Sequence, residues 1–250
     1  VLSSVIPNCI SYDPTFGYEL ALIIHDGLRR MVSNQEDVFY YITVMNENYA
    51  HPGLPEGAEE GILKGMYLFK SGAKHKAKTG ADKPLRVQLL GSGTILREVI
   101  AAGELLQKDW DVGADIWSCT SFTELRREGL DCERWNLLHP SETPRESWVE
   151  KNLKRSPGPV VAASDYIKTF AEQIRPFIPR GRAYRVLGTD GFGRSDTRER
   201  LRDFFEVDRR WVALAALKAL ADQGEITAAV VAAAIKKYDI DPDKPNPVTV

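Results

Sequence analysis

The chain has 250 residues, of which 43% are hydrophobic and 27% are charged, and its formal net charge is −2. This length and composition are typical of a globular protein with one large domain or two smaller ones, and they exclude a disulfide-stapled mini-protein and a globally disordered chain. The near balance of charges gives no overall attraction to nucleic acid or to an anionic membrane, so neither is expected as a partner. No apolar run reaches the roughly 18 residues of a membrane-spanning helix.

The cysteines and the N-terminus indicate where the chain resides. Cys9, Cys119 and Cys132 are odd in number and widely spaced, which favours reduced thiols in the cytoplasm over a disulfide framework or a zinc site. The first residues, 1–5, contain neither an initiator Met nor the pattern of a signal peptide. We therefore expect a cytoplasmic chain that is an excised part of a longer protein.

The first third of the chain predicts a helix, a strand and a second helix. Apolar residues recur at helical spacing over 17–31, a β-branched and aromatic run predicts a buried strand over 38–45, and Pro55 opens a helical pattern over 56–69. The stretch 70–84 has lysines and breakers without apolar periodicity, so it predicts a linker and a domain boundary. Its basic run is interpreted as a solvated connector, with contact to an acidic partner or a phosphate as the alternative.

Strands and helices alternate after this linker. Strands are predicted over 85–90, 114–118, 160–163 and 184–187, and helices over 94–108 and 165–177. This alternation predicts an open, mainly parallel α/β sheet with helices on both faces.

The C-terminal part predicts three helices and an arm. Ser195 or Asp196 is expected to cap a helix over 197–205, and Asp208 is expected to cap a helix over 209–222 that ends at Gly224. A last helix starts at Thr227, and the proline-rich residues 242–250 predict an extended arm.

Two glycine-rich segments follow predicted strands. Gly91-Ser92-Gly93-Thr94 fails as a dinucleotide fingerprint because Leu96 occupies the third glycine position, so a tight strand-to-helix turn is preferred. The run 188–196 lacks the lysine of a P-loop. An anion-binding nest of backbone N–H groups and a loop that needs positive φ both remain open for it, with the structural role favoured.

The histidines give no metal site, because none of His25, His51, His75 and His139 stands at ligand spacing from another ligand. His25 is expected to be packed or capped. The segment 46–52, with Asn46, Glu47, Asn48 and His51, offers a carboxylate, amides, a phenol and an imidazole after a predicted strand, where α/β folds place ligands. On spacing alone, a polar turn closed by Pro52 is preferred.

Four long segments resemble the homodimeric pyruvate dehydrogenase first component, a transketolase-like family. They are IPNCISYDPTFGYEL from Ile6, MNENYAHPGLPEGAEEGILKGMY from Met45, SFTELRREGLDCERWNLLHPSETPR from Ser121 and YRVLGTDGFGRSDTRERLRDFFEVD from Tyr184. The resemblance spans nearly the whole chain. It implies that residues 1–69 are the C-terminal end of a pyrimidine-binding α/β domain, 70–84 a linker and 85–250 a transketolase-type C-terminal domain.

The resemblance also implies an enzyme that oxidatively decarboxylates pyruvate with thiamine diphosphate and Mg²⁺ and acetylates the lipoyl group of a second component. The family's Gly-Asp-Gly motif with its paired asparagines, and its glutamate for the aminopyrimidine, are not in this sequence. We therefore assign no catalytic, cofactor-binding or metal residue, and expect thiamine diphosphate and Mg²⁺ to be bound by segments outside the chain. The segment itself is expected to be structural, homodimer-forming and inactive alone.

The loop from Asn46 is similar to a Ser-Arg-Gln-Asn loop of transketolases, whose arginine holds a sugar phosphate. Asn46 stands at the arginine's position, so a substrate without phosphate, such as pyruvate, is expected. Asn46, Glu47, Asn48 and His51 are candidates for the rim of the active site. Part of a transketolase-like sugar-phosphate enzyme, or a free-standing regulatory or nucleotide-binding module that uses the loops at Gly91 or Gly188, remain as alternatives.

Overall fold

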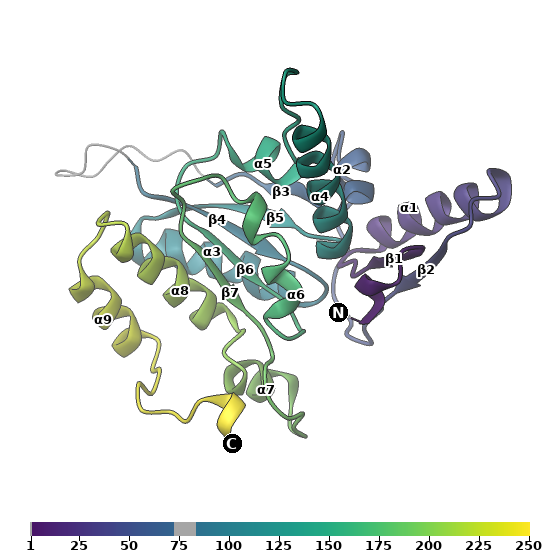
Figure 1. Ribbon diagram of the computed structural model, residues 1–250. Coiled ribbons are helices and arrows are strands. Elements are labelled where there is room, and N and C mark those ends of the chain that lie inside the picture. Colours follow the sequence, from purple (N-terminus) through teal and green to yellow (C-terminus); the bar gives the residue numbers. More distant parts are fainter. Residues whose placement is uncertain (1, 73–83) are drawn as a thin grey trace.

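The computed structural model describes residues 2–72 and 84–250 of the chain. Within these ranges the strands form two sheets, a two-stranded one near the N-terminus and a five-stranded one beside it (Figure 1). We call residues 2–64 the N-terminal unit and residues 65–72 and 84–250 the C-terminal unit. The expected α/β class is confirmed.

The N-terminal unit is built on two parallel strands. Strand β1 (Cys9–Tyr12) pairs with β2 (Phe39–Ile42). Helix α1 (Gly17–Leu28) follows β1 in the sequence, continues into a π-helical turn, Arg29–Ser33, and so connects the two strands. Strand β1 is fully buried, whereas β2 alternates exposed and half-buried residues. The strand predicted over 38–45 is therefore right in position but wrong in burial, and β1 is missing from the predictions because four residues are too few to show a period.

The segment 56–69 contains a helix and a strand where one helix is predicted. Helix α2 (Glu59–Lys64) ends at Gly65, which has a φ of 105°. A Cβ at this position would lie 2.5 Å from the carbonyl oxygen of Ser121, so only glycine fits the turn. Beyond the turn the chain enters β3 (Tyr67–Lys70), and the helix predicted to continue to residue 69 is wrong.

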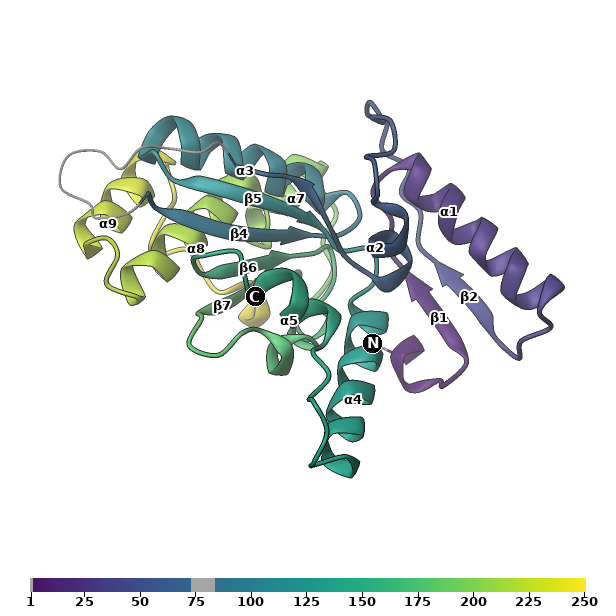
Figure 2. The same ribbon diagram turned by 90° about the horizontal axis from the view of Figure 1, so that it is seen from above.

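The five-stranded sheet has the order β3-β5-β4-β6-β7. Strand β3 is an antiparallel edge strand, and the other pairings are parallel. The strands β4 (Arg86–Gly91), β5 (Gly113–Ser118), β6 (Val160–Ala163) and β7 (Tyr184–Leu187) match the four predicted strands closely. The carboxyl ends of these parallel strands meet at one edge of the sheet, which faces the N-terminal unit and α7 (Figures 1 and 2).

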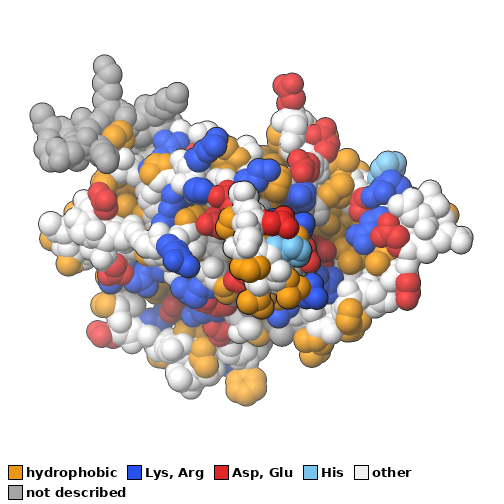
Figure 3. Space-filling view, turned by 45° about the horizontal axis from the view of Figure 1, so that its top comes forward, with side chains coloured by type: hydrophobic (Ala, Val, Ile, Leu, Met, Phe, Trp, Pro, Cys, Tyr) orange, Lys and Arg blue, Asp and Glu red, His pale blue; other side chains and the backbone are white. Residues whose placement is uncertain are grey.

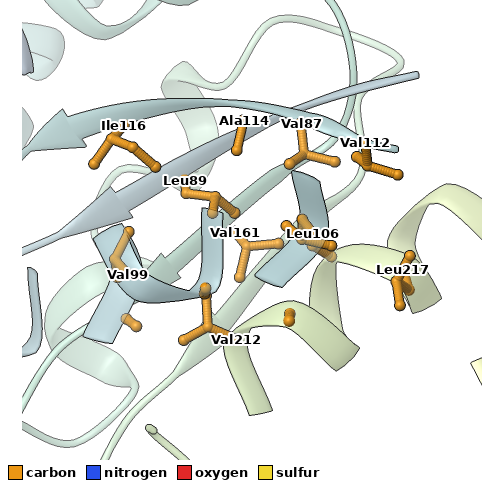
Figure 4. Packing of buried hydrophobic residues seen from close by; sticks show 14 of the residues in the cluster. Val87, Leu89, Val99, Leu106, Val112, Ala114, Ile116, Val161, Val212 and Leu217 are labelled. Atoms are coloured by element: carbon orange, nitrogen blue, oxygen red, sulfur yellow. The ribbon is translucent and has the colours of Figure 1, made fainter. Parts of the chain in front are cut away.

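One face of this sheet is covered by α3 (Ile95–Trp110), α8 (Arg209–Asp222) and α9 (Ala228–Lys237). Figure 4 shows the packing of this core, in which Val87 and Leu89 of β4 and Val161 of β6 lie against side chains of α3 and α8, including Val99, Leu106, Val212 and Leu217. These side chains are fully buried. Each stabilises the fold by about 1.5 to 3 kcal/mol through removal of apolar surface from water.

The other face is covered by α4 (Phe122–Leu138), α5 (Trp148–Leu153) and α6 (Thr169–Glu172), so helices lie on both faces as expected (Figure 2). The long helix α4 is absent from the predictions, although Ser121 caps it by accepting a hydrogen bond of 3.0 Å from the N–H of Glu124. The helix predicted over 165–177 is largely wrong. It is reduced to α6 and a 3-10 turn, Arg175–Phe177, that contains Pro176.

The C-terminal helices are close to their predictions. Helix α7 (Arg198–Phe204) begins one position later than predicted, because Thr197, and neither Ser195 nor Asp196, is its N-cap. Asp208 caps α8 as expected, with its Oδ1 accepting from the N–H groups of Arg210 and Trp211 at 2.8 and 3.2 Å. The C-terminal arm ends in a 3-10 turn, Pro247–Thr249, whose first residue is buried.

The glycine-rich segments are shaped by close packing. The turn 92–94 joins β4 directly to α3, which confirms the predicted tight turn. Gly93 has a φ of 50°, and a Cβ there would lie 2.7 Å from Oδ2 of Asp13. A Cβ on Gly191, with a φ of 109°, would lie 2.4 Å from the carbonyl oxygen of Pro247. The positive φ expected for the 188–196 loop is confirmed at Gly191.

The predicted linker 70–84 lies mostly outside the described residues, as does His75. Lys70, which it includes, is the last residue of β3 and is paired into the five-stranded sheet. On the face shown in Figure 3, basic and acidic side chains are interspersed, as the near-zero net charge leads one to expect. All three cysteines are buried and free.

Candidate functional site

The loop of residues 43–58 connects β2 to α2 and contains all four predicted site residues. Its backbone starts with the N–H of Thr43, which donates to the carbonyl oxygen of Tyr12 at 3.0 Å. From there the loop reaches α3 and α7 of the C-terminal unit, because Glu47 forms ion pairs with both helices. The loop therefore lies at the junction of the two units, as ligand-binding loops of α/β folds do.

Glu47 is the best-connected side chain of this loop. Its carboxylate is 2.5 Å from Nη1 of Arg97 on α3 and 2.5 Å from Nη2 of Arg202 on α7. Burial acts to raise the pKa of the Glu47 carboxyl, but the two guanidinium groups outweigh it and hold this pKa below its ordinary value. A carboxylate that is ion-paired in this way is a poor proton acceptor, so Glu47 positions the loop.

The ion pairs extend beyond Glu47 into a ladder. Arg202 also lies 3.4 Å from Glu98, and Glu98 lies 2.9 Å from Arg209 at the start of α8. The Glu98 side chain is 8% exposed and that of Arg202 is 12% exposed, so water screens the contact between these two weakly. The ladder links the 43–58 loop to α3, α7 and α8.

The other predicted residues have different surroundings. Oδ1 of Asn46 accepts a hydrogen bond from the guanidinium of Arg198 on α7, and the side chain of Asn48 is exposed. Nδ1 of His51 accepts from the N–H of Gly17 at 2.9 Å, and its ring stacks on Tyr49 with centroids 4.8 Å apart. The structure thus brings Asn46 and Glu47 together beside α7, whereas His51 caps the first turn of α1.

The arginines of this site, Arg97, Arg198 and Arg202, are missing from the sequence prediction. The signal for Arg198 and Arg202 is the arginine-rich run 194–210, which is typical of a solvated helix surface when no fold is known, and Arg97 has no such signal. His25, which was expected to be packed or capped, is exposed on α1, so that prediction is wrong.

Asp13 forms a second contact between the units, just after β1. Its backbone N–H donates to Thr120 at 2.7 Å, and its Oδ1 accepts from the hydroxyl groups of Thr43 at 2.6 Å and Tyr166 at 3.4 Å. Its Oδ2 is buried and has no hydrogen-bond partner in the described part of the chain. Burial raises the pKa of the Asp13 carboxyl to about 6, against the lowering effect of Thr43.

Glu19 of α1 forms a third contact and is fully buried. Its Oε2 accepts from the N–H groups of Thr15 and Phe16 at 2.5 and 2.9 Å. Its Oε1 accepts from the hydroxyl groups of Tyr67 on β3 and Ser118 on β5 at 2.7 and 2.6 Å. Burial raises the pKa of this carboxyl, and the four donors oppose that effect.

Among residues 2–72 and 84–250, no group of three or more His, Cys, Asp or Glu side chains is arranged to hold a metal ion. The carboxylates of Glu47 and Glu19 are occupied by arginines and by hydrogen-bond donors, respectively. In the same part of the chain, no helix combines the length and the apolar character needed to cross a bilayer.

Two family models match the chain. The model for the transketolase-like TK C-terminal domain matches residues 65–208, and the model for the pyruvate dehydrogenase E1 component middle domain matches residues 1–52. The first begins at Gly65, where the described C-terminal unit begins.

Curated relatives named pyruvate dehydrogenase E1 component match along the whole chain. The protein from Cupriavidus necator is 66% identical over 250 residues, covering 100% of this chain and 27% of its own length. Those from Pseudomonas aeruginosa and Escherichia coli K12 are 60% and 56% identical over 248 residues, covering 99% of this chain and 27% of their own lengths. The chain thus spans about a quarter of the length of these relatives, and the predicted resemblance is confirmed.

Solved transketolase structures share the fold. Transketolase from Campylobacter jejuni matches with a TM-score of 0.57 and 14% identity, covering 87% of this chain and 27% of that one. Transketolase from Leishmania mexicana matches with a TM-score of 0.53 and 14% identity, covering 88% and 26%. At this identity the match concerns the fold alone.

Proposed function

This chain belongs to the family of transketolase-like TK C-terminal domains, and from this membership we propose that it works as part of a pyruvate dehydrogenase E1 component. The observation that carries the proposal is the 66% identity to the Cupriavidus necator relative, which extends over all 250 residues. In the proposed reaction, the intact enzyme oxidatively decarboxylates pyruvate and acetylates the lipoyl group of a second component.

The domain assignment is part of this proposal. We propose that the N-terminal unit is the C-terminal end of a pyrimidine-binding domain and that the C-terminal unit is a transketolase-type domain. The predicted division was 1–69 and 85–250 with a linker between them. The pairing of β3 with β5 supports an earlier division, before Tyr67.

The chain's own residues do not fit a thiamine diphosphate and Mg²⁺ site. In the described ranges no metal-binding group of carboxylates and histidines exists, and Glu19 and Glu47 are saturated by their present partners. We therefore propose that the cofactor and its metal are bound by other segments of the enzyme.

The contribution of the chain is to hold the 43–58 loop. The ion pairs of Glu47 with α3 and α7 fix this loop against the C-terminal unit. We propose Asn46, Glu47 and Asn48 as part of the active-site rim, with Glu47 as a positioning residue. His51, which caps α1, is proposed at the edge of this rim because it belongs to the same loop.

The partners and the compartment are proposed from the same relatives. We propose a homodimer that works in the cytoplasm with a lipoyl-bearing second component. A role as a free-standing nucleotide-binding module receives little support, because Gly91, Gly93 and Gly191 are each accounted for by close packing.

A chimera tests the proposal. The matching region of the Cupriavidus necator relative is replaced by this chain, and pyruvate oxidation is measured with thiamine diphosphate, Mg²⁺ and a lipoyl-bearing partner. We expect activity within about tenfold of the parent, a loss of about 1.4 kcal/mol in transition-state stabilisation. A second chimera that receives the matching region of the Campylobacter jejuni transketolase is the control and is expected to be inactive.

Two outcomes would contradict the proposal. A folded chimera without pyruvate oxidation would show that this chain does not serve that enzyme, and activity on a sugar phosphate in its place would support the transketolase-like alternative. Carbon dioxide release from pyruvate by the 250-residue chain on its own would contradict the structural role.

A further inference from the structure

Helix α7 carries two of the arginines that hold the 43–58 loop, but it contributes little packing of its own. It has 7 residues, and none of them is buried. A helix this short is not stable by itself in water, so its position has to come from contacts with other segments. Near its start, Arg198 and Arg202 contact the loop. Its end is held from a different part of the chain.

The C-terminal arm, which runs from α9 back to α7 (Figure 1), holds this end through Lys244. The ammonium group of Lys244 donates to the carbonyl oxygens of Asp203 and Phe204, the last two residues of α7, at 3.1 and 2.6 Å. It also lies 3.3 Å from Oε1 of Glu206, just past the helix. Carbonyl groups in the last turn of a helix lack partners within it and carry its partial negative charge, so a cation there stabilises the helix end.

Aromatic side chains complete the surroundings of the Lys244 ammonium group. It lies 5.6 Å from the ring centre of Phe204 and 5.0 Å from that of Trp211. The Lys244 side chain is 19% exposed, so these contacts lie largely out of water, where cation–π attraction is strongest. The three N–H donors of the group have three oxygen acceptors, which is a full set. Lys244 is therefore fixed in place at the end of α7.

The arm also packs on the 188–196 loop, which precedes α7. Pro247 of the arm is buried, and a Cβ at Gly191 would lie 2.4 Å from the carbonyl oxygen of Pro247. Oδ1 of Asn246 accepts from the N–H of Val248 at 3.1 Å and closes the turn that presents this carbonyl group. The arm therefore contacts the chain on both sides of α7, before its start and at its end.

One short helix thus joins the arm to the 43–58 loop. A helix of 7 residues is about 10 Å long, so the contacts of Lys244 and those of the loop lie on a single rigid element. We propose that Lys244 is a positioning residue for the 43–58 loop, acting through α7 and its arginines, Arg198 and Arg202. This inference rests on the proposed function only where the loop is taken as the active-site rim.

A double-mutant cycle on the 250-residue chain, followed by urea unfolding, tests this connection. Glu47→Gln is measured in the native chain and in a chain with Lys244→Met, which keeps the apolar stem and removes the charge. If Lys244 holds α7 in place, the ion pairs of Glu47 are already weakened in the Lys244→Met chain. We expect the effect of Glu47→Gln on the unfolding equilibrium constant to be about three to ten times smaller there.

Lys237→Met is the matched control. It is the same substitution on α9, and the amino group of Lys237 forms an ion pair of 3.1 Å with Asp109, at the opposite end of α3 from Arg97. Its effect and that of Glu47→Gln are expected to combine additively, within about twofold in the equilibrium constant. Lys244→Arg keeps the charge, so it should leave the effect of Glu47→Gln closer to its native value than Lys244→Met does.

A nitroxide label at position 48 measures the mobility of the loop directly. Asn48 is exposed and the three native cysteines are buried, so Asn48→Cys provides the reactive thiol. We expect Lys244→Met to shorten the rotational correlation time of this label by about twofold or more, because the loop loses its support on α7. Lys237→Met should leave the correlation time unchanged.

Four results would overturn the inference: additive effects of Lys244→Met and Glu47→Gln, equal coupling in the Lys237→Met chain, a Lys244→Arg chain that behaves like Lys244→Met, or unchanged label mobility in the Lys244→Met chain. Because neither pyruvate nor a cofactor is used, these results are independent of the chimera experiment.

Discussion

Replacement of Asp13 by Asn is expected to stabilise the protein near neutral pH. Asp13 is 5% exposed, and Oδ2 of its carboxylate has no hydrogen-bond partner in the described part of the chain. Asn keeps an oxygen that accepts from Thr43 and Tyr166, and it places an uncharged amide nitrogen where Oδ2 now lies. The variant therefore resembles the protonated form of the native residue.

The sign and the magnitude follow from the raised pKa. Burial raises the pKa of the Asp13 carboxyl from 3.8 to about 6, so between these values the folded chain binds more protons at this site than the unfolded chain. Its contribution to stability is complete below pH 4 and is lost as the pH rises through 6. The pKa difference corresponds to about 3 kcal/mol. The free energy of unfolding of Asp13→Asn, relative to that of the native chain, is expected to rise by this amount as the pH increases from 4 to 7.5.

Urea unfolding of both proteins at about pH 4, 5, 6 and 7.5 measures this difference in the free energy of unfolding. Asp115→Asn is the control with the opposite sign. Burial acts to raise the pKa of the Asp115 carboxyl, but the Arg86 guanidinium and Gln88 hold this pKa below its ordinary value. Loss of the Asp115 charge should therefore destabilise the chain more at neutral pH than at low pH. A difference between Asp13→Asn and the native chain that is the same at all four pH values would refute the reasoning.

Further predictions concern the junction and the core, each measured by urea unfolding. Glu19→Gln should cost about 2 to 4 kcal/mol, since its amide group would face four donors, and an unchanged stability would contradict the hydrogen-bond pattern. Glu47→Gln should cost about 1 to 3 kcal/mol and lose its effect as the pH falls, because the pKa of this carboxyl is lowered in the folded chain. Leu106→Ala should cost about 2 to 5 kcal/mol, whereas Leu137→Ala, at a side chain that is 77% exposed, should change stability by less than about 0.5 kcal/mol.

The parts of the fold that the sequence predicts are those with local signals. The four parallel strands of the larger sheet are mainly apolar runs, and Asp208 marks the start of α8 by itself. The failures occur where tertiary contacts decide. The segment 56–69 has a helical pattern throughout, but the packing of Gly65 on Ser121 turns the chain into β3. Helix α4 carries a capping serine, yet its mixed charges hide its apolar side.

The candidate site was predicted only in part for a similar reason. A polar loop after a strand can be recognised in one sequence, so Asn46 and Glu47 could be selected. Their arginine partners come from α3 and α7, and no local sequence pattern indicates that these helices contact the loop.

The three buried or half-buried carboxylates at the junction differ in how their charge is compensated. Glu47 is neutralised by guanidinium groups, and Glu19 accepts four hydrogen bonds from uncharged donors. Asp13 has two hydroxyl donors on one oxygen and none on the other. Because ionisation is costly where the charge is poorly compensated, protonation of Asp13 favours the folded state. The hydrogen bond from Thr43 lowers the pKa of Asp13, so this contact at the start of the 43–58 loop is stronger with the ionised carboxylate, whereas burial makes the fold as a whole more stable when Asp13 is protonated or replaced by Asn.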